Sequence, residues 1–224
     1  MKYNLLNEYP KSLSPRVVGK SIRTINHRLI ATKRDKEFFN GDRNFGYGGF
    51  IYDGRWKAIA KKICNEFLLK KNSTVLQINC EKGFLLHDIK QLRDDIKVYG
   101  TETSDYAISS SMPDIKSSIH KSSPCDLKFS DNYFDFVIAL GVIYTLTLSD
   151  AIIALREINR VSKGKSFITL ATYSTEEEYF LFKDWTLLGS LLFKREEWLE
   201  ILREAKYEGH FWFTDANSLN LTRE

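Results

Sequence analysis

The sequence has little cysteine and no long apolar run. Only three of its 224 residues are cysteines, namely Cys64, Cys80 and Cys125, which lie far apart and lack C-x-x-C spacing. An odd number of scattered cysteines argues against a disulfide framework and against a zinc site. No segment approaches the roughly 20 apolar residues of a membrane span, and residues 1–19 lack the apolar run of a signal peptide. We therefore expect reduced thiols in a cytoplasmic protein that does not associate with membranes.

The chain also lacks a linker, since no tract of proline, glycine or serine interrupts it. A hydrophobic content of 43% with 28% charged residues is typical of an ordinary globular chain. We expect residues 1–56 to form a basic helical extension with a loop of glycines and aromatics, and residues 57–224 to form one α/β domain.

Positive charge is concentrated near the N-terminus, although the net charge is only +4. Residues 11–36 hold eight lysines or arginines and a single acid, Asp35. Apolar residues recur there at roughly helical spacing: Val17, Val18, Ile22, Ile25, Leu29 and Ile30. This pattern favours a helix with a solvated basic face, and a nucleic-acid site is unlikely because no nucleic-acid-binding module accompanies the charge.

Residues 38–56, FFNGDRNFGYGGFIYDGRW, alternate glycines with aromatics. Such a loop can bring its backbone close to a flat ligand, or it can be a connection pinned to the domain by its rings. Both interpretations remain open at this point.

Strand and helix patterns alternate from residue 57 onward. The expected strands are 74–79, 97–102, a weaker one in SSIHKSS, 134–140, 166–173 and HFWFT near the end, with helical patterns between them. The order predicts a doubly wound, mainly parallel sheet of the Rossmann-like type, with ligands at the carboxyl ends of the strands. A dinucleotide is unlikely, because the first turn has only Gly83 of the three glycines that a G-x-G-x-x-G motif needs.

The order of segments resembles a class I S-adenosylmethionine-dependent methyltransferase. VLQINCEKGFLL corresponds to the cofactor turn, VYGTETSDYAI to the second-strand motif, and DLKFSDNYFDFVIALGVIYTL and ALREINRVSKGKSFITL to the fourth and fifth strands. YGGFIYDGRW is similar to the N-terminal segment of a subgroup of small bacterial enzymes of surface-polysaccharide-type pathways. The resemblance covers about Gly46 to Phe213. After HFWFT only DANSLNLTRE remains, which is too short for the family's long terminal β-hairpin, so we expect a shortened C-terminal end of the sheet.

The resemblance implies S-adenosylmethionine as cofactor and a set of residues that bind it: Gln77, Asn79, Gly83, Glu102, Thr103, Ser123, Leu140 and Gly141. Glu102, at the end of the second strand, would accept hydrogen bonds from two ribose hydroxyls. The glycine-rich turn is degenerate, since Gln77 stands for an acid and Asn79 and Glu81 stand for glycines. Asparagine tolerates a left-handed backbone, whereas the Glu81 charge would oppose the cofactor carboxylate.

Methyl transfer from a sulfonium needs alignment and exclusion of water rather than a metal. No metal site is expected, because the four histidines are scattered. The resemblance suggests Tyr144, after the fourth strand, as the candidate general base for an oxygen acceptor, although an ordinary tyrosine pKa of about 10 favours a positioning role. It also suggests Tyr52 and Arg55 as groups that close over the cofactor or bind an anionic acceptor.

Two functional hypotheses follow. The first is methyl transfer to a small polar acceptor, most plausibly O-methylation of a sugar or of a phosphate-bearing intermediate. The second is a catalytically degenerate protein of the same fold that binds an intact methyltransferase. A protein partner or a homodimer is possible in either case, and a nucleic-acid methyltransferase is a third and weaker hypothesis.

Overall fold

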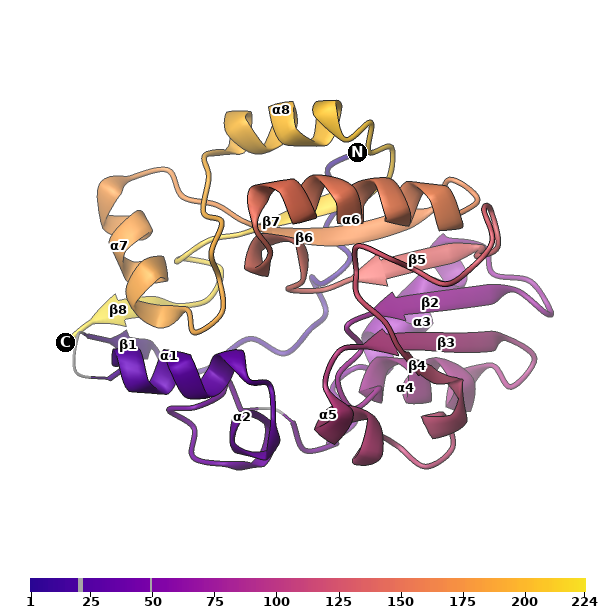
Figure 1. The fold of residues 1–224 in the computed structure, drawn as a ribbon, viewed down its shortest axis with the longest axis horizontal. Coiled ribbons are helices and arrows are strands. Elements are labelled where there is room, and N and C mark those ends of the chain that lie inside the picture. Colours follow the sequence, from indigo (N-terminus) through magenta and orange to yellow (C-terminus); the bar gives the residue numbers. More distant parts are fainter. Residues whose placement is uncertain (20–21, 49) are drawn as a thin grey trace.

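The computed structural model describes residues 1–19, 22–48 and 50–224. Its centre is a six-stranded parallel sheet in the order β4-β3-β2-β5-β6-β7 (Figure 1). The strands are β2 (Thr74–Ile78), β3 (Lys97–Glu102), β4 (Ile119–Lys121), β5 (Phe136–Ala139), β6 (Ser166–Ala171) and β7 (His210–Thr214). This is the α/β, Rossmann-like architecture that the sequence predicts.

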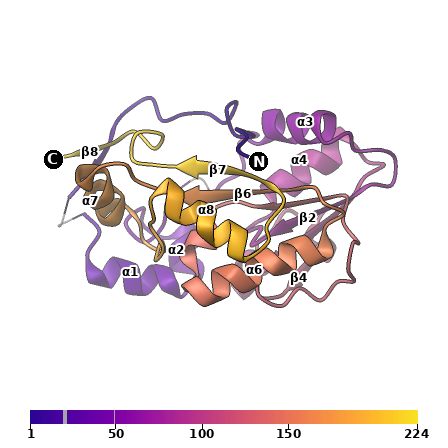
Figure 2. The ribbon, with the colours of Figure 1, turned by 90° about the horizontal axis from the view of Figure 1, so that it is seen from above.

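Helices cover both faces of the sheet, as Figure 2 shows from above. On one face lie α3 (Lys57–Glu66) and α4 (Phe84–Leu92), and on the other lie α6 (Leu148–Val161) and α8 (Arg195–Glu204). Every residue of β2, β5 and β6 is buried, because each of these strands packs against helices on two sides. Two apolar cores result, one on each face of the sheet.

Local signals explain where the helices begin. The Thr147 hydroxyl accepts from Asp150 N at 3.2 Å and so caps α6. The Ser104 hydroxyl caps α5 (Asp105–Ser109), and the Thr175 hydroxyl caps α7 (Glu176–Trp185). Short 3-10 turns, η1 (Lys116–Ser118) and η2 (Ile143–Thr145), precede β4 and follow β5.

The C-terminal residues extend the main sheet by one strand and then leave it. β7 pairs with β6 in parallel, and the last strand, β8 (Leu221–Arg223), is very short. β8 lies outside the main sheet and pairs with β1 (Arg16–Val18). The two ends of the chain are therefore joined by a small second sheet.

The N-terminal segment corrects one expectation from the sequence. A single helix spanning the basic residues was wrong, because residues 16–18 form a strand and α1 spans only Ile25–Thr32, followed by α2 (Lys36–Asn40). Lys20 of the basic group and Gly49 of the glycine and aromatic loop lie outside the described residues. Figure 1 shows α1 and α2 beside the ends of the sheet strands.

Within residues 1–19, 22–48 and 50–224, no helix is long and apolar enough to cross a membrane. In the same part of the chain, no three metal-ligating side chains converge.

Candidate active site

The turn between β2 and α4 follows the path of a glycine-rich loop although it holds one glycine. Asn79, Glu81 and Gly83 have φ values of +47°, +56° and +75°, all in the left-handed region. A Cβ on Gly83 would lie 2.3 Å from Ile115 Cδ1, so only glycine fits there. The expectation for the Asn79 backbone is thus confirmed, and Glu81 adopts the same conformation at a cost of about 1–2 kcal/mol.

Two side-chain oxygens at this turn are buried without a hydrogen-bond donor. Gln77 Oε1, at the end of β2, and Asn79 Oδ1 have no partner among the described residues. An unsatisfied buried polar group costs about 1–3 kcal/mol, so such groups in a native fold indicate a ligand or a bound water. Both are acceptors, which suits a ligand that brings N–H or O–H donors.

Glu102 ends β3 and is fully buried. Its carboxylate accepts from three main-chain N–H groups: Glu81 N at 2.8 Å, Thr103 N at 2.8 Å and Ser104 N at 2.9 Å. These bonds link the end of β3 to the turn after β2. The carboxylate therefore lies at the place where the sequence expects a ribose-binding acid.

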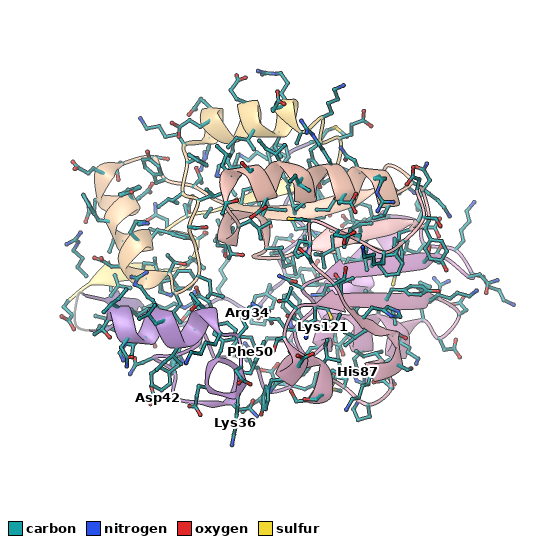
Figure 3. All side chains as sticks on the ribbon, in the orientation of Figure 1. Arg34, Lys36, Asp42, Phe50, His87 and Lys121 are labelled. Carbon is teal, nitrogen blue, oxygen red and sulfur yellow. The ribbon has the colours of Figure 1, made fainter. Side chains whose placement is uncertain are left out.

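Arg34, which follows α1, occupies the remaining side of this carboxylate. Its Nη2 lies 3.1 Å from both carboxylate oxygens of Glu102, and its guanidinium packs over Phe38 and Phe39 at 5.4 and 5.6 Å from the ring centroids. Figure 3 shows Arg34 reaching from the N-terminal segment toward the strand ends, with Phe50 nearby. Arg34 is one of eight basic residues in its segment, so no local signal distinguishes it in the sequence.

The two charged residues of the turn have different surroundings. Burial raises the pKa of the Glu81 carboxyl to about 7, while Arg34 acts in the opposite direction. Lys82 Nζ donates to Phe50 O at 3.0 Å and also to Asn40 Oδ1. Lys82 thereby holds the N-terminal segment against the turn instead of forming an ion pair with Glu81.

A pocket of about 170 Å³ opens at this turn. It is lined by Gln77, Cys80, Glu81, Lys82, Phe84 and Leu85 of the turn and α4, and by Tyr9, Tyr47, Gly48, Phe50 and Trp56 of the N-terminal segment. Sites for drug-sized ligands usually measure about 300–1,000 Å³. The pocket at the turn is smaller than this range because residues of the N-terminal segment fill part of the space beside the turn.

The other predicted cofactor residues surround the same edge of the sheet. Thr103 follows Glu102, and Ser123 lies in the loop after β4, where its hydroxyl accepts from Cys125 N at 3.2 Å. Leu140 and Gly141 follow β5, and Gly141, with φ of +69°, donates its N–H to Thr169 Oγ1 at 2.8 Å. Of the eight predicted residues, Gln77 lines the pocket itself.

The three predicted catalytic residues have different environments. Burial, together with nearby Tyr47 and Glu81, raises the pKa of the Tyr144 hydroxyl, which disfavours Tyr144 as a base. Tyr52 lies apart from the pocket lining and donates to Asp88 Oδ1 at 2.6 Å, and this bond raises the pKa of Tyr52 to about 12. Arg55 is held by Asp53, with Nε–Oδ1 at 2.8 Å. Neither Tyr144 nor Tyr52 lines the pocket at the turn, and Tyr52 anchors the loop to α4.

Comparison with known proteins agrees with this geometry. Residues 76–170 match the family model described as "Methyltransferase domain". The structure is similar to YcgJ of Bacillus subtilis, with a TM-score of 0.53 and 14% identity over 65% of this chain and 66% of that chain. The fold is a methyltransferase fold. A candidate methyltransferase of Bacillus halodurans C-125, BH2331, is similar at a TM-score of 0.52 and 16% identity, over 65% of this chain and 67% of that one. No curated protein matches the chain.

The cofactor that the methyltransferase domain implies is S-adenosylmethionine. The matched residues include the turn, Glu102 and Tyr144, whereas the segment that carries Arg34 lies outside the match. The buried acceptors Gln77 Oε1 and Asn79 Oδ1 suit the cofactor's ammonium group. Glu102 suits its ribose hydroxyls, although Arg34 holds the same oxygens. The residues present fit the cofactor. Arg34 and the ribose would compete for the same carboxylate oxygens of Glu102, so the ribose binds there only when Arg34 has moved away.

Proposed function

We propose that this protein transfers a methyl group from S-adenosylmethionine to a small polar acceptor. The acceptor atom is an oxygen of a sugar or of a phosphate-bearing intermediate, and the setting is a cytoplasmic pathway of the surface-polysaccharide type. The observation that carries the proposal is the turn after β2, whose left-handed backbone and two unpaired acceptors lie beside a buried carboxylate at the end of β3.

Each residue of the turn has a separate task in this proposal. Gln77 and Asn79 hold the amino-acid end of the cofactor, and Gly83 lets α4 begin close to it. Glu102 binds the ribose hydroxyls. The hydrogen bonds that these hydroxyls donate replace the ones that Arg34 donates to Glu102 in the structure. When bound, the cofactor supplies an activated methyl group on a sulfonium.

The acceptor side involves Tyr144 and the N-terminal segment. Since the pKa of Tyr144 is raised, its hydroxyl stays protonated and orients the acceptor by a hydrogen bond instead of removing a proton. Tyr47, Phe50 and Trp56 shield the pocket from water on the side opposite the turn. Thr103, Ser123, Leu140 and Gly141 frame the adenosine and methionine ends.

A second candidate function rests on the Arg34–Glu102 pair. A buried carboxylate already satisfied by a guanidinium and three N–H groups has little left to offer a ribose, and the Glu81 side chain narrows the pocket. This observation favours a non-catalytic partner of an intact methyltransferase. The two candidates differ in whether cofactor can displace Arg34.

Isothermal titration with S-adenosylmethionine and its demethylated product distinguishes them. If the protein is a methyltransferase, it binds at micromolar concentration, Glu102→Gln weakens binding at least tenfold, equivalent to about 1.4 kcal/mol, and Arg34→Ala strengthens it. Thermal melting of each variant shows whether it is folded. The matched control is Lys33→Ala, which removes an exposed neighbouring cation and should leave binding unchanged.

The enzyme proposal is contradicted if neither the wild-type protein nor Arg34→Ala binds at roughly millimolar ligand. A Kd of that size corresponds to a binding free energy of about −4 kcal/mol. The search would then turn to a protein partner.

A further inference from the structure

A second and larger pocket lies away from the cofactor turn. It measures about 500 Å³ and is formed by residues between 4 and 16 and by residues between 212 and 220. Its walls therefore come from the two ends of the chain, which β1 and β8 join. A volume of this size is within the usual range for a small-molecule site.

The lining includes several amides and aliphatic hydroxyls, and no acidic residue belongs to it. These amides and hydroxyls are on Asn4, Asn7, Ser12, Thr214, Asn217, Ser218 and Asn220. An amide both donates and accepts, so a group of them suits a ligand with several hydroxyls.

Two cations, Lys11 and Arg16, complete the polar lining. Arg16 Nη1 donates to Leu219 O at 3.1 Å, and neither cation has a carboxylate within ion-pair distance in the described part of the chain. Burial and the nearby Arg43 charge lower the pKa of Arg16, so a bound anion would stabilise the charged guanidinium. A half-buried guanidinium without a counter-ion suits a phosphate.

Two acids that contact the segment 215–218 are held by other partners. Asp215 accepts from Ser218 N at 2.9 Å and lies 3.5 Å from Arg195, while Glu178 accepts from Asn217 Nδ2 at 2.6 Å and from Ser174 N. Neither carboxylate lines the pocket. Both instead position the loop that carries the polar residues.

Tyr9 connects this pocket to the pocket at the cofactor turn, because it lines both. Its ring packs on Trp56 at 4.5 Å between centroids, and Trp212 also lines the larger pocket. A molecule held in the larger pocket could therefore extend past Tyr9 toward the turn.

We propose that this pocket binds a phosphate-bearing sugar, with Arg16 and Lys11 on the phosphate and the asparagine amides on the hydroxyls. The idea that the bound molecule is the methyl acceptor rests on the proposed function, whereas the binding itself does not. The pocket would hold the acceptor's phosphate end while its sugar end points to the cofactor.

The test follows the indole N–H resonances of the full-length protein by two-dimensional NMR. Trp212→Phe assigns the Trp212 signal, and Trp198, buried with Nε1 bonded to Ala171 O, serves as an internal control. The probes are the 1- and 6-phosphates of glucose, galactose and mannose, the three free sugars, and inorganic phosphate. All titrations are made without S-adenosylmethionine, so failure of this proposal and failure of the methyltransferase proposal are separate results.

At least one sugar phosphate should shift the Trp212 resonance with a Kd of roughly 1 mM or tighter, and Arg16→Gln should weaken it about tenfold. Arg156→Gln, at an exposed arginine paired with Glu204, should have no effect. The proposal is overturned if no sugar phosphate shifts Trp212, or if a free sugar or inorganic phosphate binds as tightly as its sugar phosphate. The last comparison needs only the wild-type protein, so it holds even if Arg16→Gln does not fold.

Discussion

Helices α1 and α6 both read as amphipathic in the sequence, yet they are held in place by different forces. Helix α6 buries Ala151, Ala154, Leu155, Ile158 and Val161 against the sheet. Helix α1 buries only Ala31, while Ile25 and Leu29 are 72% and 57% exposed.

The inward contacts of the α1 region are made by arginines. Arg28 Nη2 donates to Lys183 O at 2.8 Å at the end of α7, and Arg34 pairs with Glu102. In this protein, apolar periodicity identifies the buried face of α6, which packs on the sheet. It does not identify the buried face of α1, whose neighbouring elements offer hydrogen-bond acceptors to arginine side chains. Where main-chain carbonyls and a buried carboxylate are present, the guanidinium groups decide which side turns inward.

The largest expected difference comes from truncating one leucine on each helix. Leu155→Ala should lower the free energy of unfolding by about 3–5 kcal/mol, because it leaves a cavity in a fully buried core. Leu29→Ala should change it by less than about 0.5 kcal/mol, since that side chain is exposed. Urea denaturation measures both, and equal losses would show that α1 packs through its apolar face after all.

A smaller effect is expected from Arg34→Ala. Removing one partner of a buried ion pair costs about 3–5 kcal/mol, and because Glu102 keeps three main-chain donors we expect about 2–3 kcal/mol. Lys33→Ala, at the adjacent exposed residue, is the matched control and should be nearly neutral. A loss no greater than that of the control would mean that the charge of Arg34 does not hold α1 in place.

The third test concerns Glu81, whose charge a ligand-binding turn would not need. Its carboxyl pKa rises from 4.5 to about 7 on folding, so the native state binds more protons than the unfolded state between these values. The free energy of unfolding should therefore fall as pH rises through that interval and stay level above it.

Two substitutions divide this effect into its parts. Glu81→Gln should remove the Glu81 contribution to the pH dependence and keep the backbone strain, whereas Glu81→Gly should remove both and add about 1 kcal/mol to stability. Denaturation of the wild-type protein and of Glu81→Gln at about pH 5 and about pH 8 tests this, because the lowered pKa of His210 acts on both proteins alike. A difference in stability between the two proteins that is the same at both pH values would contradict the raised pKa of Glu81.

The central fold could be predicted because its signals are local. The apolar run at 136–139 and the β-branched run at 74–78 are buried on both faces, and the parallel order follows from their alternation with helices. The small sheet of β1 and β8 could not be predicted, since three-residue strands have too few residues to show a period and their pairing joins opposite ends of the chain.

The positions of the candidate site residues could be predicted where a residue lies at the end of a strand or directly after it. Gln77, Asn79, Gly83 and Glu102 lie at the carboxyl ends of β2 and β3, because parallel strands bring those ends together. Arg34 and Lys82 could not be placed, since their partners Glu102 and Asn40 are 68 and 42 residues away.

By itself, the sequence determined the order of strands and helices, the left-handed turn that needs Gly83, and the acid at the end of the second strand. These features depend on periodicity and backbone sterics within a few residues of chain. Only the tertiary structure decided that Arg34 meets Glu102, that Arg28 of α1 contacts the end of α7, and that the two chain ends enclose a pocket lined by no acidic residue. Those outcomes depend on contacts between charged residues that are far apart in the sequence. The free energy of such a contact is set by the distance between the charges and by their burial, and neither can be read from a local sequence pattern.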